Sequence, residues 1–100
     1  MVQLKQMPQV QQTIPATVKS SDMPAELEEE VLLKSYEAME LFNSDIQIAR
    51  YLTAHFQQKH KNSVWHCVIG RKFASNITHE SRFFIYYYIG TKAFLLFKSS

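Results

Sequence analysis

The sequence has little of what a disulfide-bonded, membrane-spanning or nucleic-acid-binding protein needs. Its single cysteine, Cys67, cannot form an intrachain disulfide, which is typical of a reducing compartment. No apolar run approaches the roughly 18 residues that span a bilayer, and the glutamine-rich N-terminus is not shaped like a signal peptide. The 11 lysines and arginines are scattered and the net charge is only +2, so no basic stripe is formed. We expect a cytoplasmic protein that binds neither nucleic acid nor membrane.

Patterns typical of catalysis and metal binding are also missing. The chain has two glycines and no glycine-rich turn that would present a nucleophile. His66 and Cys67 are adjacent in a predicted strand, so their side chains point to opposite faces and cannot readily share a metal or a proton. The four histidines lack a ligand spacing such as i, i+4. A hydrolase that uses Cys67 or His79 is the enzyme alternative, but we expect no enzyme, no cofactor and no metal site.

What the sequence does have is a C-terminal half dense in aromatic residues. Residues 64–98 hold nine of the 13 aromatic side chains, in runs that predict strands at 64–70, 72–78, 81–89 and 92–98. Gly90-Thr91 predicts a tight hairpin. The run 83–89 is apolar at consecutive positions, which is expected where both faces of a sheet are covered. A 100-residue chain with two helices cannot cover both, so we expect a second copy to supply the other layer.

Two amphipathic helices precede these strands. The first opens with Pro24 near its first helical position, and Ser44 with Gln47 forms a capping-box pattern that starts the second. Each helix has one apolar stripe and so covers one sheet face. The order helix, helix, antiparallel sheet predicts an α+β domain over residues 19–100, after a flexible arm at 1–18. The expected stripes are Leu27, Val31, Ser35, Ala38 and Phe42, then Ile48, Leu52 and Phe56.

Several short motifs, in this order and spacing, resemble the eight-kilodalton dynein light chain family. The resemblance runs from about Lys19 to Ser100. It implies two helices packed on an antiparallel sheet, in a homodimer with a strand exchanged between protomers. The motifs are Ser21-Asp22-Met23, Trp65-His66-Cys67-Val68-Ile69-Gly70-Arg71, Phe73, Thr78-His79-Glu80, Phe84-Ile85-Tyr86-Tyr87-Tyr88-Ile89-Gly90 and Leu95-Leu96-Phe97-Lys98-Ser99.

The same resemblance implies a non-catalytic light chain that binds short linear motifs of disordered partners by strand addition. The family's best-known partner is the dynein intermediate chain, which implies a subunit of the microtubule motor on the cytoplasmic cytoskeleton. The alternative is a dynein-independent dimerisation hub for diverse client proteins.

The predicted strand at 72–78 is the strongest candidate for a functional site, because it is less apolar than the neighbouring strands. From its residues alone, a plain protected edge is the alternative. By resemblance, this strand crosses to the partner protomer and forms one wall of a peptide groove. The implied peptide-binding residues are Asp45, Ile46, Arg71, Lys72, Phe73, Ala74, Ser75, Asn76, Ile77, Thr78, His79, Phe84, Tyr86, Tyr88, Ala93 and Leu95.

The resemblance also implies a dimer interface at His66, Thr78 and Ser99. Two facing His66 side chains would repel when protonated, so acid should loosen the dimer. Ser99 matches a regulatory phosphorylation site, where added negative charge should favour monomers.

The chain departs from the family pattern at several positions. Lysine is expected at Ile46, asparagine at Lys72, glycine at Ala74 and tyrosine at Asn76, so the preferred client motif should differ from the usual one. In the arm, Gln11-Gln12-Thr13 loosely resembles a client core, and self-binding is a further hypothesis.

Overall fold

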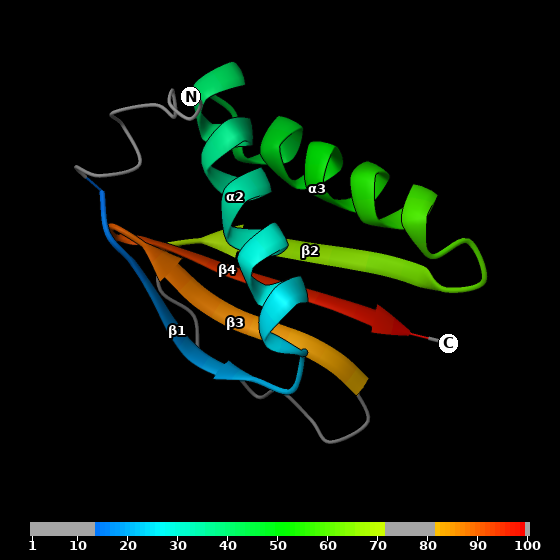
Figure 1. Cartoon of the computed structure of the whole chain (residues 1–100). Coiled ribbons are helices and arrows are strands. Elements are labelled where there is room, and N and C mark those ends of the chain that lie inside the picture. The colour runs from blue at the N-terminus through cyan, green and yellow to red at the C-terminus, as the bar shows by residue number, and fades with distance from the viewer. Residues whose placement is uncertain (1–13, 72–81, 100) are drawn as a thin grey trace, which may run out of the picture.

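Two helices and four strands follow one another in a computed structural model that describes residues 14–71 and 82–99. All strand pairs are antiparallel, in the order β1-β3-β4-β2. This confirms the predicted α+β class of two helices on an antiparallel sheet (Figure 1). The elements are β1 (Ala16–Ser21), α2 (Ala25–Leu41), α3 (Asp45–Lys59), β2 (Val64–Gly70), β3 (Arg82–Ile89) and β4 (Lys92–Ser99).

The predicted strand at 72–78 lies outside the described residues. The first strand begins at Ala16, before residue 19, where the sequence places the start of the domain. It pairs with β3, and a bulge interrupts the register between Val18 and Ser20. The ordered sheet therefore extends into the end of the predicted arm.

The helix α2 begins where the local chemistry of proline favours a first turn. Pro24 is its N-cap, and its carbonyl accepts the first helical hydrogen bond, from the Glu28 amide at 2.9 Å. Proline suits this place because its fixed φ matches the helix and its missing amide hydrogen is not needed there. The side chains of Val31, Ser35 and Ala38 are buried, as the apolar stripe predicts.

The helix α3 starts at the predicted cap. The Ser44 hydroxyl accepts a hydrogen bond from the Gln47 amide at 3.4 Å, which is one half of the capping box. Ile48, Leu52 and Phe56 are buried in the order that the sequence predicts. Both helices therefore present one apolar stripe to the sheet.

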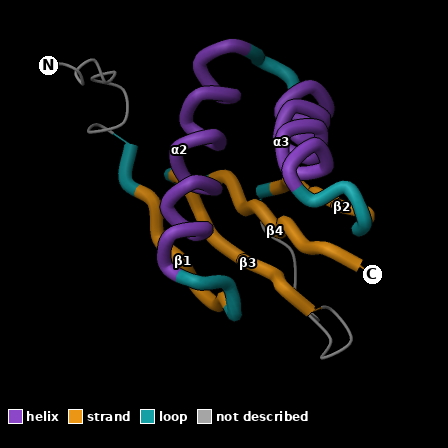
Figure 2. Tube along the Cα trace, turned by 45° about the vertical axis from the view of Figure 1, so that its right-hand side comes forward, coloured by secondary structure: helices purple, strands orange, loops and turns teal. Residues whose placement is uncertain are grey.

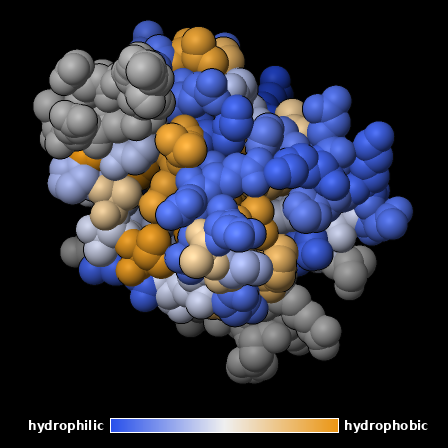
Figure 3. Space-filling model, in the orientation of Figure 1, coloured by the Kyte–Doolittle hydropathy of each residue, from blue (hydrophilic) through white to orange (hydrophobic). Residues whose placement is uncertain are grey.

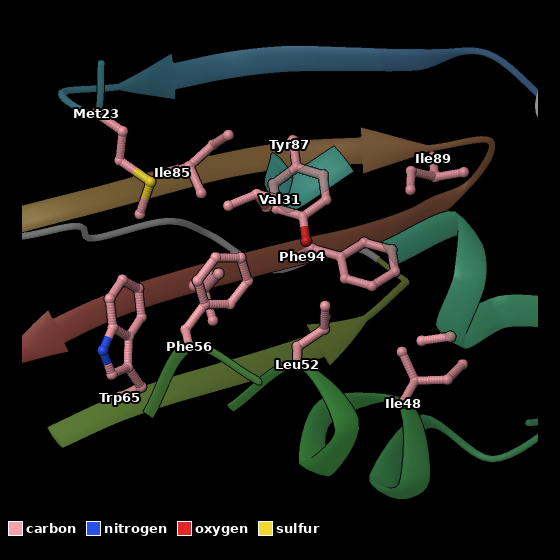
Figure 4. Close-up of a cluster of buried hydrophobic side chains, with 12 residues drawn as sticks. Met23, Val31, Ile48, Leu52, Phe56, Trp65, Ile85, Tyr87, Ile89 and Phe94 are labelled. Atoms are coloured by element: carbon pink, nitrogen blue, oxygen red, sulfur yellow. The ribbon is translucent and has the colours of Figure 1, made fainter. Parts of the chain in front are cut away.

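The core lies between the helices and one face of the sheet, and Figure 2 shows both helices on the same side. Tyr87 of β3 stacks on Phe94 of β4, with ring centroids 4.9 Å apart and an interplanar angle of 11°. Trp65 closes one end of the cluster beside Phe56 (Figure 4). The fully buried residues include Val31, Leu52, Phe56, Ile85, Tyr87, Phe94 and Leu96.

The side of the molecule seen in Figure 3 is mostly hydrophilic, with small separate apolar patches. Within residues 14–71 and 82–99, no helix is long and apolar enough to cross a membrane.

Candidate functional site

The sheet face opposite the helices carries most of the described residues that the sequence assigns to a binding site. Strand alternation sends Ile85, Tyr87 and Ile89 toward the helices, so Phe84, Tyr86 and Tyr88 lie on the other face. No helix of the described chain covers that face (Figures 1 and 2). We call it the open face, and its residues include Val64, His66, Val68, Phe84, Tyr86, Tyr88, Ala93, Leu95, Phe97 and Ser99.

Cross-strand pairing brings the predicted groove residues into one aromatic surface. Phe84 pairs with Phe97, Tyr86 with Leu95, and Tyr88 with Ala93. The Tyr86 and Tyr88 hydroxyls lie 3.3 Å apart, and this hydrogen bond raises the pKa of Tyr86. The surface is therefore apolar in its body and polar at the tips of its tyrosines, as is common where aromatic residues bind other chains.

The β2 end of the open face is the most exposed apolar part of the sheet. Val64 is 55% exposed and Val68 46% exposed. Between them, His66 stacks on Phe97 with ring centroids 4.9 Å apart, and its Nε2 lies 3.1 Å from Ser99 Oγ. The predicted interface residues His66 and Ser99 are thus in contact, whereas Thr78 lies outside the described residues.

The strand β2 is also an edge of the described sheet. It pairs with β4 alone among the strands that the structure describes. Near its start, the Trp65 amide donates to Gln57 Oε1 at 3.2 Å, so a side chain serves this part of the edge. Beyond it, the strand offers main-chain groups with which an added strand can pair.

A polar hollow of about 570 Å³ lies at one end of β2, next to the start of α3. The Lys92 Nζ atom and the Asp45 carboxylate form an ion pair at 2.6 Å, which ties the β3–β4 turn to α3. Ile46 is 65% exposed at the rim. The structure thus brings together three predicted site residues, Asp45, Ile46 and Arg71. The full lining is Asn43, Ser44, Asp45, Ile46, Gly70, Arg71, Thr91 and Lys92.

The remaining predicted site residues, Lys72, Phe73, Ala74, Ser75, Asn76, Ile77, Thr78 and His79, lie outside the described part of the chain. They therefore remain predictions from the sequence.

The position of Cys67 does not suit a catalytic nucleophile. Its side chain is on the helix-covered face and packs against the core, whereas His66 is exposed on the open face. Burial raises the pKa of the Cys67 thiol to about 12, so almost no thiolate forms near neutral pH. The predicted separation of the two side chains is confirmed. In the described residues no three His, Cys, Asp or Glu side chains are grouped to hold a metal ion.

A charged cluster between the helices was not predicted from the sequence. Glu30 of α2 accepts hydrogen bonds from Lys59 at 2.8 Å and contacts His55 Nε2 at 2.7 Å, both on α3. His55 and Lys59 are four residues apart, so their shared helix face is visible in the sequence. Their partner on another helix is not visible, because it depends on how the two helices pack.

Comparison with known proteins agrees with this architecture. The family model described as dynein light chain type 1 matches residues 15–99. The dynein light chain-like domain of the Fasciola hepatica calcium binding protein FhCaBP2 has a TM-score of 0.76 at 20% identity, over 87% of this chain and 93% of that one. The DLC-like domain of CsTAL3 has a TM-score of 0.67 at 13% identity, over 81% and 88%. These two structures support the fold alone, and the family model, which spans most of the chain, shows that the protein belongs to the dynein light chain family.

Proposed function

We propose that this protein is a non-catalytic homodimeric light chain that binds short linear motifs of disordered partners by strand addition. The observation that carries the proposal is the open face. It carries aromatic and aliphatic side chains that the chain's own helices leave uncovered, with Tyr86 and Ala93 buried among their neighbours, beside an edge strand with exposed Val64 and Val68.

The geometry suggests how two protomers would use this surface. A strand donated by the partner protomer, predicted at 72–78, would pair along the edge of β2 and leave its own outer edge for a client. The client's side chains would then rest on Phe84, Tyr86, Tyr88 and Leu95. Main-chain hydrogen bonds supply affinity in this mode, and side-chain pockets supply selectivity.

The hollow at the start of α3 would receive the end of the client segment. First-turn amides of a helix have no partner within the helix, and they can donate to a side-chain carbonyl or carboxylate. Arg71 at the rim adds a positive charge. In a dimer, two such grooves hold two copies of a client, and linking two sites raises avidity by about 10² to 10⁴.

The proposed partner in the cell is the dynein intermediate chain, in the cytoplasmic motor complex on microtubules. A dynein-independent hub for other clients is the second candidate. One observation favours it: Ile46, 65% exposed at the hollow's rim, replaces the lysine expected in the family and changes the charge of the site. A pull-down from cell extract, probed for the dynein intermediate chain, separates the two candidates.

Sedimentation and a peptide array test the proposal as a whole. The purified chain should sediment as a dimer at micromolar concentration, and the array should yield short extended binders. Val68→Lys places a charge on the exposed end of the open face and should produce folded monomers. Leu33→Lys, on α2 and 50% exposed, is the matched control and should remain dimeric. A monomeric wild-type chain that binds no peptide would refute the proposed function.

A further inference from the structure

The start of β3 holds a strained residue. Phe83 has φ of +64°, in the left-handed region that bulky side chains rarely adopt. It occupies a register shift in the pairing of β3 with β4, between Arg82 and Phe84. Such strain persists only when the surroundings determine it, and it is concentrated at functional positions.

The neighbouring Asp22 holds this bulge in place. Its Oδ1 accepts a hydrogen bond from the Phe84 amide at 2.7 Å, and its Oδ2 accepts one from the Phe83 amide at 3.2 Å. The Asp22 amide in turn donates to the Phe84 carbonyl at 3.1 Å. Hydrogen bonds to an ionised acceptor are stronger than neutral ones, so this three-bond contact can offset the strain at Phe83.

No other described contact accounts for the Asp22 carboxylate. It does not cap α2, because the N-cap of that helix is Pro24 and makes no side-chain hydrogen bond. It forms no ion pair with any residue in the described ranges. The Phe83 ring has its own role, since it packs against the core with the Lys98 ammonium 4.4 Å from its centroid.

Side chains alternate between the two faces of a strand, so a bulge of one extra residue exchanges the faces of all residues on one side of it. Beyond it, Phe84 and the rest of β3 keep the pairing that places Phe84 on the open face. Without the bulge, Phe83 would pair with Lys98, and the chain before it would enter β3 with its faces exchanged. The bulge therefore fixes the register at which β3 begins, with Arg82 paired to Lys98.

We propose that Asp22 is a positioning residue for strand exchange: by locking the bulge at Phe83, it sets the phase of the segment that precedes β3. This inference rests on the proposed function, which places the exchanged strand at 72–78, in that segment. Asp22 touches neither client nor partner in this proposal. It acts through Phe83 and Phe84.

Four variants of the full chain test the proposal: Asp22→Ala, Phe83→Gly, the double variant, and Glu29→Ala as a matched loss of an exposed carboxylate on α2. Two quantities are measured for each: the dimer dissociation constant by sedimentation equilibrium, and the urea midpoint at one protein concentration. Asp22→Ala should weaken the dimer about tenfold or more, because two amides at the bulge lose a charged acceptor. Glu29→Ala should leave both quantities unchanged.

The double variant gives the decisive result. Glycine adopts a positive φ without strain, so Phe83→Gly should restore the bulge and return the dimer constant of Asp22→Ala toward the wild-type value. The urea midpoint should fall further, since the Phe83 ring no longer packs on the core. The two quantities therefore change in opposite directions, which a merely structural role of Asp22 would not produce. If Asp22→Ala does not fold, Asp22→Asn replaces it, retains one acceptor oxygen and should weaken the dimer less.

Two results overturn the inference alone: a dimeric Asp22→Ala with an unchanged constant, or a double variant whose dimer constant worsens together with its urea midpoint. A monomeric wild-type chain that binds no peptide would overturn the proposed function as well, so the two failures are distinguishable.

Discussion

The hydrogen bond between Ser35 and Tyr87 predicts an asymmetric effect of removing either partner. Tyr87 Oη lies 2.6 Å from Ser35 Oγ inside the core, and both residues are fully buried. The Ser35 hydroxyl donates its proton to the Val31 carbonyl at 2.8 Å. Tyr87 must therefore be the donor in the pair, because Ser35 has only one proton to give.

The magnitudes follow from which group is left without a partner. Ser35→Ala leaves the buried Tyr87 hydroxyl without its acceptor, which should lower the free energy of unfolding by about 1 to 3 kcal/mol. Tyr87→Phe removes the donor, and Ser35 keeps its bond to Val31, so the loss should be about 0.5 to 1.5 kcal/mol. The double variant leaves no unpaired hydroxyl. It should be more stable than Ser35→Ala alone.

Urea unfolding of the wild type, both single variants and the double variant, at one protein concentration, measures this cycle. Thr53→Ala is the matched control. Thr53 also donates to the carbonyl four residues before it, Ala49, at 3.1 Å, but it is partly exposed and has no hydrogen-bond partner on the strands that the structure describes. Its effect should stay within about 0.5 kcal/mol. If the effects of the two single variants simply add in the double variant, the argument that Tyr87 depends on Ser35 is wrong.

Two further predictions concern the pH dependence of stability. Burial raises the pKa of Cys67 from 9.0 to about 12, so the folded chain keeps a proton that the unfolded chain loses, and stability should fall as the pH rises from about 9 toward 12. Cys67→Ala should flatten this slope in urea unfolding, and an unchanged slope would argue against burial as its cause. For Glu30, burial raises the pKa, but hydrogen bonds from Lys59 and His55 outweigh it and the net pKa is lowered. The unfolded chain therefore binds this proton first as the pH falls below about 4.5, and stability is lost there. Glu30→Gln should reduce the acid loss, and an equally steep loss would contradict the assignment.

Local patterns were sufficient to predict the helices. The spacing of Val31, Ser35 and Ala38, and of Ile48, Leu52 and Phe56, follows the helical period, and all six residues are buried. Pro24 marks the start of α2 because its fixed φ suits a helix start and it has no amide hydrogen to satisfy. Ser44 marks the start of α3 because its hydroxyl accepts a hydrogen bond from a first-turn amide. These features depend on neighbours within four residues, which a sequence displays directly.

The sequence did not predict which face of β3 the helices cover. Both alternating sets are apolar, with Ile85, Tyr87 and Ile89 on one face and Phe84, Tyr86 and Tyr88 on the other, so period alone cannot choose. The resemblance assigns the second set to the groove, and the structure places it on the open face. Its role in binding remains a prediction.

Features that join distant segments could not be predicted at all. Asp22 accepts a hydrogen bond from the Phe83 amide across 61 positions of sequence, and the Ser35 hydroxyl contacts Tyr87 across 52. In the sequence, Ser35 reads only as a polar interruption of an apolar stripe. A single polar residue gives no indication of its partner until the helix is packed on the sheet.

The distribution of exposed apolar side chains bears on association. The side of the molecule seen in Figure 3 is mostly hydrophilic. The helices expose Leu33, Leu41 and Ile46, at 50%, 59% and 65%. On the open face, the edge strand exposes Val64 and Val68, whereas Tyr86 is only 8% exposed and Ala93 is fully buried. A second chain that covered the edge would remove the most exposed apolar groups of the sheet from water, at about 25 cal/mol for each Å² of apolar surface. Among the strands, the free energy available for association is therefore greatest at β2, which is the reason to test Val68 before the other residues of the open face.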